Sequence, residues 1–284
     1  MRSKRDHMLP SIIAADFSSW IHSSRIVISL ICVLVYCLIL SSQSLAGKIN
    51  GETILLSLEE KVYLQMCHGY NKMGSLLFLL MISELPRRTA FHYYTAIRTS
   101  RWKWLLSQLV YIALISASIL LIMTLLYAAI VAPSSSSSPI FTDDKMVAQG
   151  IYREDESIIS SEVRKLFSPL QAILWASLPV YLFWCIMGYT VLLFSLLGHP
   201  LVGPSFFGFI LMGLTNVNWE AAPEWFHLPI EYANVSAIRA HPELDSVQGI
   251  NQVNLFLVFT TFLLVGILSI VIRKMDYSKI TKAW

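Results

Sequence analysis

The chain alternates long uncharged apolar runs with shorter polar segments, and this pattern predicts membrane-spanning helices. A helix that crosses the roughly 30 Å hydrocarbon core of a bilayer needs about 20 predominantly apolar residues. Six runs approach or exceed that length, so we expect an all-α membrane protein with six transmembrane helices. The predicted spans cover about residues 26–45, 64–85, 104–132, 170–197, 201–217 and 253–272.

Two of these predicted spans depend on local detail. The uninterrupted apolar part of the second span is short, from Met73 to Leu85, and we extend the span backwards to Leu64. The fourth and fifth spans are separated by LGHPLVGP, in which Pro200 and Pro204 prevent one continuous helix. We therefore expect these two spans to form a tight hairpin.

The amino-acid composition excludes an ordinary soluble domain. Of the 284 residues, 55% are hydrophobic and 14% are charged, and the mean hydropathy is +0.60. These values are not those of an ordinary soluble domain. The net charge of +3 is small, and we expect no nucleic-acid partner because the basic residues gather on one side of the predicted membrane topology.

Charge also predicts the orientation, because loops rich in Lys and Arg stay on the cytoplasmic side. With six spans and the N-terminus inside, the inner segments hold 13 of the 21 Lys and Arg residues. Their balance is then +9, whereas that of the outer segments is −6. We expect both termini to be cytoplasmic in a multi-pass protein of the bacterial cytoplasmic membrane.

The remaining segments divide into a leader and two long outer loops. Residues 1–25 form a predicted cytoplasmic leader, and residues 26–284 form a single six-span domain. Apolar leader residues recur at helical spacing, which favours a helix in contact with membrane lipid, although a frayed polar leader stays open. These residues are Ile12, Ile13, Phe17, Trp20 and Ile21. The outer loops are residues 133–169 and 218–252.

The second outer loop alternates acidic with aromatic residues, and two readings of it are open. Aromatic side chains with a polar edge favour the membrane interface, so the loop can rest on the outer leaflet. Alternatively, its aromatic side chains contact an amphipathic cationic cargo as it leaves. The candidate cargo-exit contacts are Trp219, Trp225, Phe226 and Tyr232.

Sequence motifs for metal and nucleotide binding are missing from the chain. It contains no HExxH, GxGxxG or GxxxxGK[ST] pattern, and its four cysteines form no CxxC pair. We expect no cofactor and no catalytic residue in this chain. Glu59 and Glu60 match the start of the EExxxR signature of membrane proteases, but the arginine of that signature is missing.

A basic and aromatic segment separates the second and third predicted spans. Glu84 ends the second span, Pro86 suits a helix start, and the residues from Arg87 to Arg98 allow about three helical turns. Phe91 and Tyr94 share a face of such a helix. Taken alone, the segment either rests on lipid or inserts into a groove on a partner protein.

This segment resembles the coupling helix of the type-2 permeases of bacterial ATP-binding-cassette (ABC) exporters. In that family an acidic residue is followed by Arg, a Gly-Thr pair and a Pro-x-Ser-Arg turn. The chain has Glu84, then Arg87-Arg88-Thr89, then Arg98-Thr99-Ser100-Arg101. It departs from the pattern at Arg88, where the family has Gly, and near Ile97, where the Pro is missing.

The resemblance implies a permease subunit that pairs with a second copy or a related chain. Each permease would dock on a separate cytoplasmic ATPase that binds ATP and Mg²⁺. On this hypothesis the aromatic residues and His92 fill a groove, the arginines pair with acids of the ATPase, and Glu84 fixes the elbow by pairing with Arg101. The implied coupling residues are Glu84, Arg87, Arg88, Phe91, His92, Tyr93, Tyr94, Arg98 and Arg101.

The cargo and two other function classes stay open at this stage. Few ionisable residues lie in the predicted spans, which disfavours an ion pathway and favours an amphipathic or hydrophobic cargo. The acidic aromatic outer loops favour export of a peptide, such as an antimicrobial peptide, or immunity to one. The alternatives are an intramembrane protease-like enzyme and a membrane sensor or scaffold that transports nothing.

Overall fold

A computed structural model shows a predominantly helical chain. It describes residues 18, 24–43, 47–49, 52–54, 57–68, 74–83, 100–135, 165–214 and 247–274. The helices are α3 (Ser24–Gln43), α4 (Leu58–His68), α5 (Ser75–Ile82), α7 (Arg101–Val131), the short 3₁₀ helix η2 (Ala132–Ser134), α10 (Pro169–Leu196), α11 (Val202–Leu214) and α14 (Val247–Lys274). Strands β1 (Gly47–Ile49) and β2 (Glu52–Ile54) pair antiparallel.

Three described helices are long and apolar enough to cross a membrane. They are Arg101–Ser134, Pro169–Leu196 and Asn251–Lys274. The 31 residues of α7 alone extend about 46 Å, which exceeds the roughly 30 Å hydrocarbon core of a bilayer. The predicted class, a helical membrane protein, agrees with these three helices.

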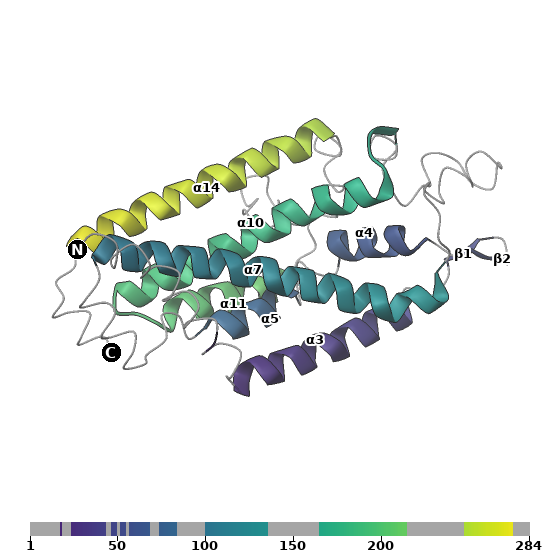
Figure 1. Cartoon of the computed structure of the whole chain (residues 1–284), viewed down its shortest axis with the longest axis horizontal. Coiled ribbons are helices and arrows are strands. Elements are labelled where there is room, and N and C mark those ends of the chain that lie inside the picture. The colour runs from purple at the N-terminus through teal and green to yellow at the C-terminus, as the bar shows by residue number, and fades with distance from the viewer. Residues whose placement is uncertain are drawn as a thin grey trace, which may run out of the picture.

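Helix α10 lies at the centre of the bundle. It packs against α4, α5, α7, α11 and α14, so its side chains are covered on most sides (Figure 1). The large buried residues Phe183, Trp184 and Met187 all belong to it. Helix α14 lies at the periphery, where side chains such as Phe259 and Phe262 are exposed.

Helix α7 runs antiparallel to α4, α10 and α14. Tyr189 Oη of α10 donates a hydrogen bond to the Leu109 carbonyl of α7, at 3.3 Å, so the end of α10 lies beside the start of α7. Arg101 at the start of α7 donates to the carbonyl of Arg273 at the end of α14. Lys61 of α4 reaches Ser134, beyond the end of α7. These three contacts order the helices along one axis (Figure 1).

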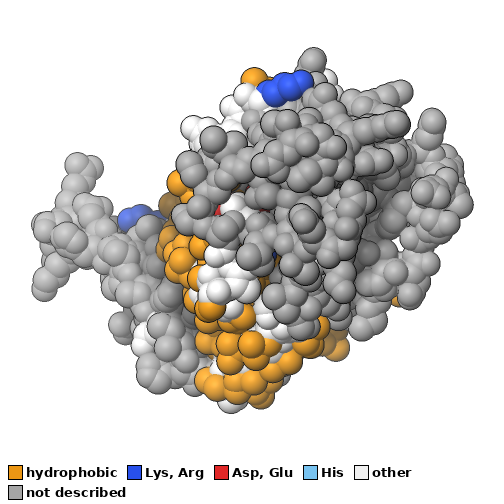
Figure 2. Space-filling model, turned by 90° about the vertical axis from the view of Figure 1, so that its right-hand side faces the viewer, with side chains coloured by type: hydrophobic (Ala, Val, Ile, Leu, Met, Phe, Trp, Pro, Cys, Tyr) orange, Lys and Arg blue, Asp and Glu red, His pale blue; other side chains and the backbone are white. Residues whose placement is uncertain are grey.

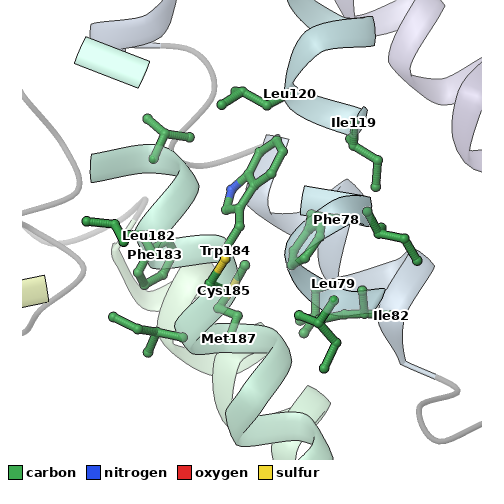
Figure 3. Packing of buried hydrophobic residues seen from close by; sticks show 14 of the residues in the cluster. Phe78, Leu79, Ile82, Ile119, Leu120, Leu182, Phe183, Trp184, Cys185 and Met187 are labelled. Atoms are coloured by element: carbon green, nitrogen blue, oxygen red, sulfur yellow. The ribbon is translucent and has the colours of Figure 1, made fainter. Parts of the chain in front are cut away.

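The middle of the bundle is built around Trp184. Its indole lies between Phe78 of α5 and Ile119 and Leu120 of α7 (Figure 3). The Trp184 and Phe78 rings stack with centroids 4.9 Å apart and planes 8° apart. Trp184 Nε1 donates to Ser75 Oγ at 2.9 Å, so the one polar atom of this side chain is satisfied without water.

Local sequence explains where the helices begin and end. Ser100 caps α7, because its Oγ accepts a hydrogen bond from the backbone N–H of Lys103. Gly198 follows α10 with a φ of +90°, a conformation that glycine adopts without strain. The His199 backbone N–H then donates to the Phe194 carbonyl at 2.9 Å. The chain reverses there and α11 packs back onto α10, as the sequence LGHPLVGP predicts.

The region of the second predicted span holds two helices instead of one. Helix α4 begins at Leu58, before the predicted start at residue 64, and α5 ends at Ile82. Between them lies GYNKM, residues 69–73, outside the described part of the chain.

Exposed apolar side chains form much of the described surface. On α3 they recur along one face, at Val27, Ile28, Ile31, Leu34, Val35, Leu38 and Ile39. Figure 2 shows hydrophobic side chains gathered along the lower edge of the molecule, where α3 lies in Figure 1. Hydrocarbon chains of lipid cover such a face at no cost in lost hydrogen bonds, which agrees with a membrane environment.

Candidate functional site

The predicted coupling segment is described only at its edges. Glu84 and the basic and aromatic residues from Arg87 to Arg98 lie outside the described residues, so their assignment stays a prediction. The segment leaves α5, which is followed by the turn at Ser83, and enters α7 at the cap residue Ser100. These two points fix which helices the segment joins.

Arg101 is the member of the predicted coupling set that the structure describes. Its Nη1 atom donates to the carbonyl oxygen of Arg273 at 3.3 Å. The predicted pairing with Glu84 involves a residue outside the described part. The hydrogen bond to Arg273 connects the start of α7, which follows the predicted coupling segment, to the end of α14.

This contact belongs to a basic end of the bundle. Arg101 and Lys103 lie in the first turn of α7, and Arg273 and Lys274 lie in the last turn of α14. Cations in the last turn of a helix are stabilised by its dipole. An accumulation of Arg and Lys at one end is what the positive-inside rule predicts for the cytoplasmic end.

The candidate cargo-exit contacts lie outside the described residues. Trp219, Trp225, Phe226 and Tyr232 belong to the stretch 215–246 between α11 and α14. Both readings of this loop, rest on the outer leaflet and contact with cargo, therefore stay predictions.

A cluster of buried polar residues on α4 was not predicted from the sequence. Four polar residues in or next to the first two turns of α4 are buried: Ser57, Glu60, Lys61 and Gln65. Glu60 is one of the two acidic residues in the first turn of this helix. The helix packs against α10 and α7. The sequence pattern Ser57-x-x-Glu60 is typical of a helix N-terminus. That pattern predicts the helix start, but not its burial.

Two reciprocal hydrogen bonds hold the start of α4. The Ser57 N–H donates to Glu60 Oε2 at 2.8 Å, and the Glu60 N–H donates to Ser57 Oγ at 3.2 Å. This capping box satisfies two backbone donors at the helix N-terminus, which have no partner within the helix. The Glu60 carboxylate is thereby engaged in structure, as expected for a group with no solvent exposure.

Lys61 connects the start of α4 to the end of α7. Its Nζ atom donates to the Ser134 carbonyl at 2.8 Å and lies 3.5 Å from Ser134 Oγ. The last carbonyls of a helix lack partners within the helix, and an ammonium group is a favourable cap for them.

Two buried atoms of this cluster make no hydrogen bond among the described residues. They are Gln65 Nε2, whose side chain lies against Tyr36 of α3, and Oε2 of Glu59, which precedes Glu60 on α4. Buried polar groups are nearly always paired in folded proteins, so an unpaired one is a reason to look for a ligand or a partner. Among the described residues no group of three His, Cys, Asp or Glu side chains lies close enough to hold a metal ion.

Comparisons with known proteins do not identify the chain. No protein-family model, no curated protein and no solved structure matches it. The class that the fold defines is therefore a predominantly helical protein with three helices suited to cross a membrane.

Proposed function

We propose that the chain is the permease subunit of a bacterial ABC exporter. It moves an amphipathic or hydrophobic cargo outward across the cytoplasmic membrane, with ATP hydrolysed by a separate subunit. The observation that carries this proposal is the basic end of the bundle, where Arg101 is bonded to the end of α14. The segment with the permease-like motif enters α7 at this end.

The proposal includes six spans with both termini in the cytoplasm. Helices α3, α7, α10, α11 and α14 supply five of them, and α4 and α5 together supply the second. The antiparallel contacts of α7 with α10 and with α14 support this arrangement. So does the contact between Lys61 and Ser134, which puts the start of α4 at the end of α7 opposite the basic end.

The topology has a direct test in fusions to a phosphatase that is active only outside the cytoplasm. We expect fusions after residues 145 and 240 to be active, and fusions after residues 93 and 280 to be inactive. The second span decides the result at residue 93, because without it the coupling segment would lie outside. An active fusion at residue 93 would contradict the topology and the coupling role together.

The proposed mechanism transmits ATP-driven motion through the basic end. Closure of two ATPases would push two coupling segments together, one from this chain and one from its permease partner. The contact between Arg101 and the end of α14 makes α7 and α14 move with that segment. The bundle then switches between two packed arrangements and opens a path outward, as in other rigid-body transitions.

The coupling role is tested by replacing Arg88 with Glu and Tyr94 with Ala together. We expect the variant to stay in the membrane but to lose its ATPase in a pull-down. The reason is that the proposed attraction between Arg88 and acids of the ATPase becomes a repulsion, and the proposed aromatic anchor Tyr94 is removed from its groove. Cargo transport in reconstituted vesicles should stop in parallel.

Lys274→Glu is the matched control for this experiment. Lys274 is exposed at the same end of the bundle, in the last turn of α14, but lies outside the motif. We expect Lys274→Glu to retain the ATPase. Undiminished ATPase binding by the double variant would remove the coupling assignment. A purified wild-type chain that never binds an ATPase would favour the sensor or scaffold instead.

A further inference from the structure

Two exposed cations flank the contact between the start of α7 and the end of α14. Arg101 Nη1 donates to the Arg273 carbonyl at 3.3 Å, so these two helix ends are held together. Lys103 lies in the first turn of α7 and Arg273 in the last turn of α14, and both side chains are exposed. Within the described ranges, neither Lys103 nor Arg273 has a carboxylate partner.

The start of α7 is an electrostatically unfavourable place for cations. The N-terminal end of a helix carries a partial positive charge, which favours anions and disfavours Lys and Arg nearby. The first turn of α7 nevertheless holds two cations and no acidic residue. The bond from Lys103 to Ser100 Oγ uses the backbone N–H and not the ammonium group. An anion bound beside Lys103 would therefore lower the electrostatic energy of this helix end.

Exposed apolar side chains lie about one turn from the two cations, on both helices. Leu106 follows Lys103 by three residues, and Ile270 precedes Arg273 by three. Residues three apart share a face of a helix and differ by about 4.5 Å in height. Leu106 is 38% exposed and Ile270 is 57% exposed. Each helix thus presents a cation and then an apolar side chain, in the order phosphate and acyl chain of a phospholipid.

The two cations also lie at the level of lipid headgroups. Helix α14 carries no charged residue before Arg273, and α7 carries none after Lys103. Both helices are long and apolar enough to cross a membrane, so the charges at their ends border the hydrocarbon core. A soluble anion would use the cations alone, whereas a lipid uses the cations and the exposed apolar side chains together.

We infer that Lys103 and Arg273 bind the phosphate of an anionic phospholipid, whose acyl chains lie along Leu106 and Ile270. The two cations come from different helices, so one bound lipid joins the start of α7 to the end of α14 beside the bond from Arg101. This inference goes beyond the proposed permease function and does not depend on it, because binding requires neither ATP nor an ATPase.

The test counts the lipids bound to the detergent-purified full chain by native mass spectrometry. The probes are dioleoylphosphatidylglycerol, which is anionic, and dioleoylphosphatidylcholine, which has the same acyl chains and no net charge. We expect the first phosphatidylglycerol to bind at least about tenfold more tightly than the first phosphatidylcholine. The reason is that each Lys or Arg near an anionic headgroup contributes about fivefold in affinity.

Lys103→Gln and Arg273→Gln should each reduce the preference for phosphatidylglycerol about fivefold. Both substitutions keep the backbone groups that bond to Ser100 and Arg101, so the contact between α7 and α14 is preserved. Lys165→Gln is the matched control, because it removes one exposed cation just before α10, at the opposite end of the bundle. We expect Lys165→Gln to keep the wild-type preference.

A headgroup without acyl chains separates a lipid site from a site for free phosphate. Glycerol 3-phosphate at the same concentration as the lipid should displace no phosphatidylglycerol, because it cannot cover Leu106 and Ile270. Displacement as effective as that by the lipid itself would assign the cations to a soluble phosphate and overturn the lipid site.

Two further results would overturn the inference. They are equal affinity of the wild-type chain for the two lipids, and an equal preference in Lys165→Gln, Lys103→Gln and Arg273→Gln. The comparison of lipids and the displacement need no variant, so the inference stays testable if the variants misfold. Because no ATPase is present, such a failure leaves the pull-down test of Arg88 and Tyr94 untouched.

Discussion

Replacing Trp184 by Ala is expected to destabilise the helix bundle by about 3–5 kcal/mol, the usual cost of truncating a large buried aromatic side chain. Trp184 has no solvent exposure. Its ring stacks on Phe78 and its Nε1 donates to Ser75, so a single truncation empties the contact between α5 and α10. The measurement is thermal unfolding of the detergent-purified protein, followed by the loss of helical circular dichroism.

Two milder variants separate the ring from its hydrogen bond. Trp184→Phe keeps an aromatic ring against Phe78 but loses the bond to Ser75, and should cost less than Trp184→Ala. Hydrogen bonds between membrane helices average about 0.6 kcal/mol, so Ser75→Ala should cost about that much. Trp102→Ala is the control, because Trp102 of α7 is 48% exposed. Equal losses at residues 102 and 184 would contradict this account of the core.

The helices of the bundle were largely predictable from the sequence, because a long uncharged apolar run has one low-energy structure in a membrane. Every backbone N–H and C=O must be paired inside the run, and a helix achieves this locally. The described bounds of α10 and α7 accordingly lie within three residues of the predicted spans. The remaining differences come from caps such as Ser100, which set the first helical residue more sharply than hydropathy does.

The burial of α4 was not predictable in the same way. Its sequence, LEEKVYLQMCH, alternates charged and apolar residues and is typical of a solvated helix. The group that makes burial of Lys61 tolerable is the carbonyl of Ser134, 73 residues further along the chain. No local sequence pattern identifies such a distant partner, so we predicted Glu59 and Glu60 to lie in an outer loop.

The coupling site could be predicted only in part from the sequence, for a different physical reason. On the proposed function, the groove and the charges that the segment recognises belong to the ATPase and not to this chain. The sequence offers Arg87, Arg88 and Tyr94 in a suitable order, and the structure offers the Arg101 contact beside them. Binding experiments with the ATPase therefore test what the segment recognises.

Replacing Gly203 by Ala is expected to force α11 away from α10. A Cβ atom at this position would lie 2.9 Å from Val191 Cα, which belongs to the backbone and cannot rotate aside. Overpacking of this kind typically costs about 1–3 kcal/mol. We expect a lower midpoint in the same thermal unfolding measurement, with α11 the first helix to expose its backbone amides to hydrogen exchange.

Gly208→Ala is the matched control, because a Cβ atom at Gly208 meets nothing within 4 Å. Both glycines lie in α11, where Ala is the better helix former by up to about 1 kcal/mol; Gly203, in the first turn, gains less from this than Gly208 in the interior. A Gly203→Ala midpoint well below that of Gly208→Ala, by more than the propensity difference of at most about 1 kcal/mol, reports the contact with Val191. If Gly203→Ala and Gly208→Ala shift the midpoint equally, α11 does not pack against α10 at this point, and the hairpin between the two helices is looser than its close contact implies.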